Sequence, residues 1–308
     1  MSRTSGIRGW CYLVYLSLSR QARVGQLVWI AIGLLGLSIA IVAINTRANR
    51  WTMDRWRFFG RRGPTLSQWM QESEARLHRA TQGTSGSNLY QAIWGSVRAI
   101  VKQSDFLVFS RGFIILLFVS FLLPVWSLAF ATSAIGMEIE DQSLLWIMTR
   151  PLPRWSIYLA KFIALLPWTI GFILGGFALL CLAAGRPGPI AFQLFWPAIF
   201  WGALAFSSLF LLMGAFLKRP AIMAIVYSFF LEVIAGNMPG TFKRISFGFY
   251  TRCIMFENAE ELGLQPADPL IYEPVSSSTA QLVLLLATIG LLLVGMVLFE
   301  RKELSGPD

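Results

Sequence analysis

Residues 112–137 read GFIILLFVSFLLPVWSLAFATSAIGM, a run of 26 residues without a charged side chain between Arg111 and Glu138. A helix of about 20 apolar residues is long enough to cross the hydrocarbon core of a bilayer. The apolar residues in this run do not alternate with polar ones, so the run is typical of a helix and not of a barrel strand. We therefore predict a membrane-spanning helix here.

Five further runs are also long and apolar, without alternation between apolar and polar residues. One of these five runs carries a single charge, Glu232. Only helices and closed barrels satisfy their own backbone hydrogen bonds in lipid. The predicted fold is therefore an all-α membrane protein, a bundle of six transmembrane helices forming a single transmembrane domain over residues 1–308. The predicted spans are residues 26–45, 112–135, 157–184, 194–217, 220–240 and 278–299.

The composition agrees with a membrane protein and argues against several other classes. The mean hydropathy is +0.60, and 14% of residues are charged, against about 25% in a soluble domain. The net charge of +10 is better explained by basic residues that flank spans than by nucleic-acid binding. Three scattered cysteines and a single histidine, His78, predict no disulfide framework, no metal site and no catalytic centre.

The distribution of Lys and Arg predicts the orientation of the chain. An even number of spans places both termini on one side, and that side carries 11 of the 26 basic residues, against four in the short loops opposite. The segment 46–111 holds the other 11, but long loops translocate largely regardless of charge. We therefore expect cytoplasmic termini and a long external segment, 46–111, between the first two spans.

Two semi-apolar segments lie outside the predicted spans. Residues 10–26 resemble an interfacial helix leading into the first span. Residues 237–277 form a second external region whose prolines prevent a long helix. Four aromatic residues there are expected to dip into the interface as a short re-entrant piece: Phe242, Phe247, Phe249 and Tyr250.

The most specific segment lies between the second and third predicted spans, where residues 138–154 read EIEDQSLLWIMTRPLPR. We predict a short cytoplasmic helix over 137–150. Glu138, Glu140 and Asp141 would occupy its first turn, where the helix dipole favours anions. Pro151 disfavours helical geometry in the residue before it and ends the helix. An acid-tipped amphipathic helix of this kind is suited to the groove of a soluble partner.

This segment resembles the ABC-2-type export permease family. The family motif reads loosely Glu-x-Glu-x-Gly-Thr, a hydrophobic run, Pro-x-Ser-Arg, and Lys seven residues later. The residues that match it in type and spacing are Glu138, Glu140, Pro151, Arg154 and Lys161. The departures are Gln142 for Gly, Ser143 for Thr and Pro153 for Ser. The six spans, the long first external segment and the tail FERKEL at 299–304 also look like this family, so the resemblance covers nearly the whole chain.

The resemblance implies a multi-pass permease subunit in the cell (inner) membrane. It would form a homodimer among membrane lipids, bind two copies of an ABC ATPase subunit, and export a substrate by alternating access. The implied ATPase-coupling residues are Glu138, Glu140, Asp141, Pro151, Arg154 and Lys161. The sequence itself lacks Gly-x-x-x-x-Gly-Lys-Ser/Thr, so ATP and Mg are expected on the partner chain and this chain is not expected to be an enzyme.

Glu232 lies 13 residues into the predicted fifth span. An ionisable group at that depth is either a substrate or proton site facing the bundle interior, or a solvated group near the outer interface. Two other functions therefore stay open. One is an ion-gradient-driven secondary transporter, which would usually show several intramembrane charges and an inverted repeat. The other is a scaffold for a membrane complex.

Overall fold

The computed structural model describes residues 10–18, 26–47, 105–140, 153–217, 241–266 and 272–301, with single residues at 223, 226, 227 and 230. Within these ranges the regular structure is helical throughout. Five of the described helices are long and apolar enough to cross a membrane. They are Trp29–Arg47, Asp105–Ala131, Trp155–Ala184, Gly188–Phe216 and Ser277–Arg301.

These five helices confirm five of the predicted spans, with longer bounds at most ends. They are α2 (Gln26–Arg47), the continuous pair η2 (Phe109–Leu122) and α5 (Leu123–Glu140), α7 (Arg154–Ala184), α8 (Gly188–Phe216) and α12 (Ser277–Arg301). Four residues of the predicted span 220–240 are described, all with helical backbone. The count of six spans therefore stays a prediction.

The turn between α7 and α8 fixes the direction of both helices. Gly185 adopts φ 71°, in the left-handed region, and its N–H bonds to Leu182 O at 3.3 Å. At Gly188 a Cβ atom would collide with the backbone carbonyl of Cys181. Both positions therefore require glycine, and α7 and α8 form a tight antiparallel hairpin. We name the two ends of the bundle after α7: the Arg154 end, where it begins, and the Ala184 end, where it finishes.

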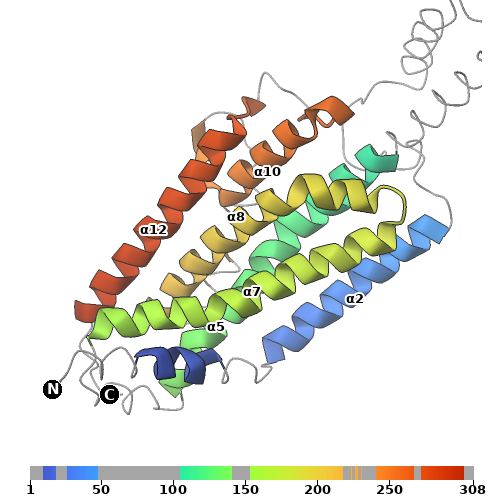
Figure 1. Ribbon diagram of the computed structural model, residues 1–308. Helices are drawn as coiled ribbons and strands as arrows, with labels where there is room; N and C mark the ends of the chain where they lie inside the picture. The colour runs from blue at the N-terminus through green and yellow to red at the C-terminus, as the bar shows by residue number, and fades with distance from the viewer. Residues whose placement is uncertain are drawn as a thin grey trace, which may run out of the picture.

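The remaining spans follow from their contacts with α7 and α8 (Figure 1). The Thr46 hydroxyl donates to Ala183 O at 3.0 Å, so α2 also ends at the Ala184 end. The rings of Tyr158 and Phe299 lie 5.9 Å apart, so α12 ends at the Arg154 end. α8 therefore ends at the Arg154 end, and α12 begins at the other end of the bundle.

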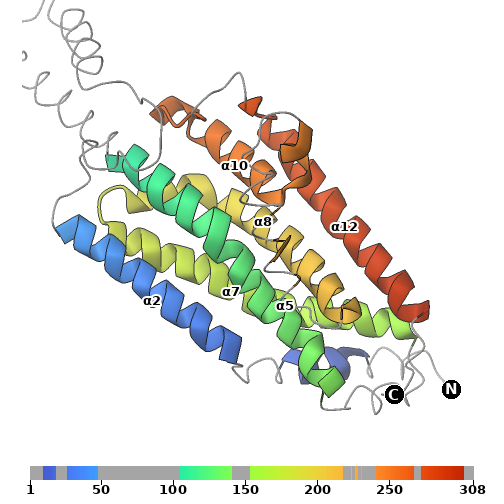
Figure 2. The same cartoon turned by 180° about the vertical axis from the view of Figure 1, so that it is seen from behind.

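The core between α5 and α7 is aromatic. Trp126 is fully buried, and its ring lies edge-on to Phe118 at 5.4 Å and to Phe172 at 5.1 Å between centroids. Gly176 makes room for it, since a Cβ there would come within 2.9 Å of the indole ring. Phe118 also packs 5.2 Å from Phe177, so η2 and α5 run antiparallel to α7. Figure 2 shows η2 and α5 crossing in front of α7.

The second span begins earlier than the sequence predicts. The backbone is already helical at Asp105, before residue 112, and Arg111 lies inside the helix. The Arg111 guanidinium reaches Gln265 O at 3.1 Å. A long basic side chain that can extend to a polar partner does not have to end a span, because its stem packs against apolar surface while its charge is satisfied elsewhere.

A short helix lies inside the bundle on the Ala184 side. α10 (Phe247–Asn258) follows η5 (Thr241–Ile245) and precedes η6 (Glu260–Leu262). The Phe247 ring, at the start of α10, lies 5.7 Å from the ring of Phe206. Phe206 is about 27 Å from the first residue of α8, at a rise of about 1.5 Å per residue. The Asn258 amide, at the end of α10, donates to Leu194 O at 2.9 Å, close to the start of α8. α10 therefore starts deep in the bundle and rises toward the Ala184 end between α8 and α12 (Figures 1 and 2). The segment predicted as a short re-entrant piece contains this helix, and its position relative to the membrane stays a prediction.

Candidate functional site

The first two acidic residues of the predicted coupling segment do not begin a separate helix. α5 continues to Glu140, so Glu138 and Glu140 lie in its last turn. Their placement in a first turn, with support from a helix dipole, was therefore wrong. The chain between Ile135 and Glu140 contains no proline, and nothing in its sequence stops a helix that is already formed. The predicted helix over 137–150 otherwise falls on residues 141–150, outside the described residues.

The start of α7 is built by Pro153. This residue has extended backbone, with φ −64° and ψ 135°, and its carbonyl accepts from Ser156 N at 3.0 Å and from the Ser156 hydroxyl at 2.8 Å. A fixed proline φ and a serine that closes the first turn together set the direction of the helix. Arg154 is thereby the first residue of α7, three residues earlier than predicted.

Lys161 does not face solvent. It lies in the second turn of α7, and only 4% of its surface is exposed. A side chain this buried offers no surface to a soluble partner, so any part it plays in coupling would act through the position of α7. Asp141, Pro151 and Glu232 lie outside the described residues.

Residues 10–18 are helical, as predicted within the segment 10–26, and this helix joins the same region, a contact that was not predicted. The Trp10 indole donates to Ser156 O at 3.0 Å, and the Trp168 indole donates to Leu18 O at 3.1 Å. The helix therefore lies along the first half of α7, at the same end of the bundle as the end of α5 (Figures 1 and 2). The contact could not be predicted, because the carbonyl that each indole N–H reaches depends on how the helices pack.

α12 also packs closely on the start of α7. A Cβ at Gly295 would collide with the phenol ring of Tyr158, which is fully buried. The end of α5, the start of α7, the end of α12 and the 10–18 helix thus meet at the Arg154 end. A force applied there would reach every described span, because α7 packs against α2, α5, α8 and α12.

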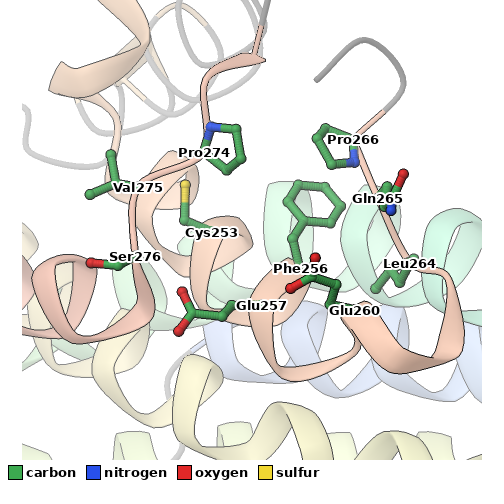
Figure 3. A pocket seen from close by; sticks show the side chains of 10 residues that line it. All are labelled: Cys253, Phe256, Glu257, Glu260, Leu264, Gln265, Pro266, Pro274, Val275 and Ser276. Carbon is green, nitrogen blue, oxygen red and sulfur yellow. The ribbon is translucent and has the colours of Figure 1, made fainter. Parts of the chain in front are cut away.

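A hollow of about 360 Å³ lies at the opposite end, beside α10. The segment from Pro274 to Ser276, which we call the strap, leads into α12. Figure 3 shows the strap passing over α10 on one side of the hollow and η6 on the opposite side. The walls of the hollow are Cys253, Phe256, Glu257, Glu260, Leu264, Gln265, Pro266, Pro274, Val275 and Ser276. The Glu257 carboxylate accepts from the Ser277 N–H and so ties α10 to the first turn of α12, where a negative charge is favourable.

Charged side chains gather near this hollow on η5 and α10. Lys243 Nζ lies 3.9 Å from Glu273 Oε2, and Arg244 Nη2 lies 4.0 Å from the same atom. Lys243 is 1% exposed and Arg252 is 5% exposed. Burial raises the pKa of the Cys253 thiol and, most strongly, that of the Tyr272 hydroxyl, so both keep their protons at neutral pH. These residues do not stand out in the sequence, because their burial depends on α10 packing inside the bundle.

The described residues contain no group of three or more His, Cys, Asp or Glu side chains that could hold a metal ion. Charged and aromatic side chains line both ends of the bundle in the part of the chain that the structure describes. That chemistry suits binding and conformational coupling.

The long apolar helices and the packed bundle define a multi-pass helical membrane protein. A family model described as ABC-2 family transporter protein matches residues 17–304. The chain therefore belongs to this family, which confirms the resemblance found in the sequence. No curated protein gives a significant match to the chain.

Proposed function

We propose that the chain is the permease subunit of an ABC transporter and works as an exporter in the cell membrane. Family membership supports the permease class. The observation that carries the mechanism is the meeting of α5, α7, α12 and the 10–18 helix at the Arg154 end. On this proposal that end is cytoplasmic, and two copies of an ATPase subunit dock there and bind ATP and Mg.

In the proposed mechanism α7 transmits the movement of the ATPase subunits to the bundle. ATP binding draws the two ATPase subunits together, and the turn at Pro153 passes this movement to α7 as a rigid body. The contacts of Tyr158 with α12 and of Thr46 with the far end of α7 then carry the motion through the bundle. Two such bundles, in a homodimer, would rock between inward-open and outward-open states.

The test is affinity purification of the tagged chain from its native membranes in mild detergent, with identification of the co-purifying chains. We expect an ATP-binding subunit in comparable amount. The double variant Glu138→Lys/Arg154→Glu should lose it, because both charges lie where α5 ends and α7 begins. The matched control is Arg47→Glu, which changes an exposed cation at the opposite end and should leave the association unchanged.

Recovery of a homo-oligomer without any ATPase would overturn the permease proposal. The gradient-driven carrier would then become the leading alternative, and Glu232→Gln would be the variant that tests it, with substrate flux as the readout. A lone oligomer with no flux at all would favour the scaffold.

A further inference from the structure

The cluster around η5 contains two almost fully buried cations in a bundle made of apolar spans. Lys243 is 1% exposed and Arg252 is 5% exposed. The Arg252 Nε donates to Gly248 O at 3.1 Å, which holds its side chain along α10. Basic side chains inside a membrane bundle are costly to desolvate and commonly mark the path of a charged ligand.

The carboxylate beside Lys243 is held loosely. Glu273 is shared between Lys243 and Arg244 at 3.9 and 4.0 Å, and 66% of its side chain is exposed to solvent. Strong ammonium–carboxylate contacts are about 2.7–2.9 Å long. Glu273 also has φ 43°, in the left-handed region that disfavours side chains other than glycine. A long contact to an exposed, strained residue is easily exchanged for another anion.

The surroundings of Lys243 fit the head of an anionic molecule. Its ammonium lies 5.9 Å from the ring centroids of both Phe249 and Tyr272, so the cation is already partly desolvated by aromatic faces. The Tyr272 hydroxyl is buried beside the Cys253 thiol, and no described oxygen or nitrogen atom forms a hydrogen bond with it. It keeps its proton and can donate one to an incoming oxygen.

Glu273 has space in which to move. The strap after it, from Pro274 to Ser276, forms one wall of the hollow of about 360 Å³ (Figure 3). A shift of the strap into this space would not require the core of α8 and α12 to unpack. The hollow also brings solvent to the strap that directly follows Glu273.

We propose that Lys243 and Arg244 bind the phosphate group of an anionic ligand, and that Glu273 is a built-in competitor which the ligand displaces. The Glu273 carboxylate occupies the position that the phosphate oxygens take, and Tyr272 donates to the bound group. This site lies away from the Arg154 end, and its existence does not depend on the ATPase partner.

The experiment uses the purified full-length chain in a neutral detergent and isothermal titration calorimetry. The probes are dioctanoyl-phosphatidylglycerol, whose head carries a phosphate and a net negative charge, and inorganic phosphate. Dioctanoyl-phosphatidylcholine, which is zwitterionic, is the reference for binding without net charge. Binding of phosphatidylglycerol alone identifies a lipid headgroup as the ligand, whereas binding of both anions shows that the phosphate group suffices.

Substitutions of the two partners in the ion pair, Lys243 and Glu273, should change the affinity for phosphatidylglycerol in opposite directions. Lys243→Gln should weaken phosphatidylglycerol binding by about tenfold or more, the size of one lost charge-assisted contact. Glu273→Gln should strengthen it by about two- to fivefold, because the exposed pair that competes with the ligand is weak. Lys243→Arg should retain binding, Arg244→Gln should weaken it, and the control Arg47→Gln should leave it unchanged.

The opposite responses separate a binding site from a merely structural ion pair. If Lys243→Gln and Glu273→Gln both weaken binding, or neither changes it, the pair is structural and the proposal is overturned. Equal affinity for the zwitterionic lipid, or no binding of either anion, also overturns it. Should Lys243→Gln fail to fold, as judged by size exclusion and thermal melting, Arg244→Gln and Glu273→Gln still decide between the two outcomes.

Discussion

Replacing Gly202 by alanine tests whether α10 is docked inside the bundle as the structure shows. A Cβ at this position of α8 would lie 2.8 Å from Thr251 Oγ1 and 3.3 Å from Thr251 Cγ2, with Leu123 Cδ1 at 3.5 Å. Thr251 is held in place because its hydroxyl donates to Phe247 O at 3.0 Å. The new methyl group therefore pushes α10 away from α8.

The expected cost follows from the size of this overlap. Ordinary carbon contacts lie at about 3.5–4.0 Å, so α10 has to shift by several tenths of an ångström. Overpacking of this kind usually costs about 1–3 kcal/mol. If the cost falls on the docking of α10, the undocked population rises by about 5- to 150-fold.

The rate at which a maleimide labels Cys253 on α10 measures the undocked population. Cys253 is 1% exposed, so a maleimide reaches it only when α10 opens, and the labelling rate then follows the opening equilibrium. The assay measures this rate in a background with Cys11 and Cys181 replaced by serine. We expect Gly202→Ala to accelerate labelling by about 5- to 150-fold.

Two controls make the prediction specific. At Gly290 an added Cβ meets nothing within 4 Å, so Gly290→Ala should leave the rate unchanged. Thr251→Ala removes the two atoms that come closest to the new methyl and leaves only the ordinary contact with Leu123 Cδ1, so the double variant with Gly202→Ala should recover most of the slow rate. Unchanged labelling in Gly202→Ala, or equal acceleration in Gly290→Ala, would refute the docking of α10 against α8.

Three further results are expected. The Cys253 thiol is buried, which raises its pKa and keeps a maleimide away from it. Its labelling at pH 8 should therefore be far slower than that of the exposed Cys11; equal rates would argue against burial. On the proposed orientation, a membrane-impermeant maleimide should label Cys11 in inverted vesicles and not in intact cells, and the reverse result would place the Arg154 end outside. Glu257→Gln removes the carboxylate that accepts from Ser277 N–H and should lower Tm by about 1–3 °C, whereas the exposed Glu260 changed to Gln should leave Tm unchanged in the same scan.

The positions of five spans could be predicted from the sequence because a bilayer imposes a one-dimensional rule. A helix must keep charges out of about 30 Å of hydrocarbon, and the uncharged runs show where it does so. The same rule misplaced the start of the second span, because Arg111 extends to Gln265 O and a side chain's reach is not visible in a charge count. It also could not show that α5 continues through Glu138 and Glu140, since the helix dipole favours acidic residues in a first turn only weakly and does not exclude them from a last turn.

By itself, the sequence determined the class of the protein, five of its spans and its family, since each of these depends on composition, charge spacing and short motifs along the chain. Only the tertiary structure decided which segments meet at each end of the bundle. The hydrogen bonds of Trp10 and Trp168 with backbone carbonyls, the burial of Lys161 and Lys243, and the shared contact of Glu273 all join residues far apart in the chain. Such contacts depend on how helices pack, and the identity of a residue does not state which distant partner will cover it.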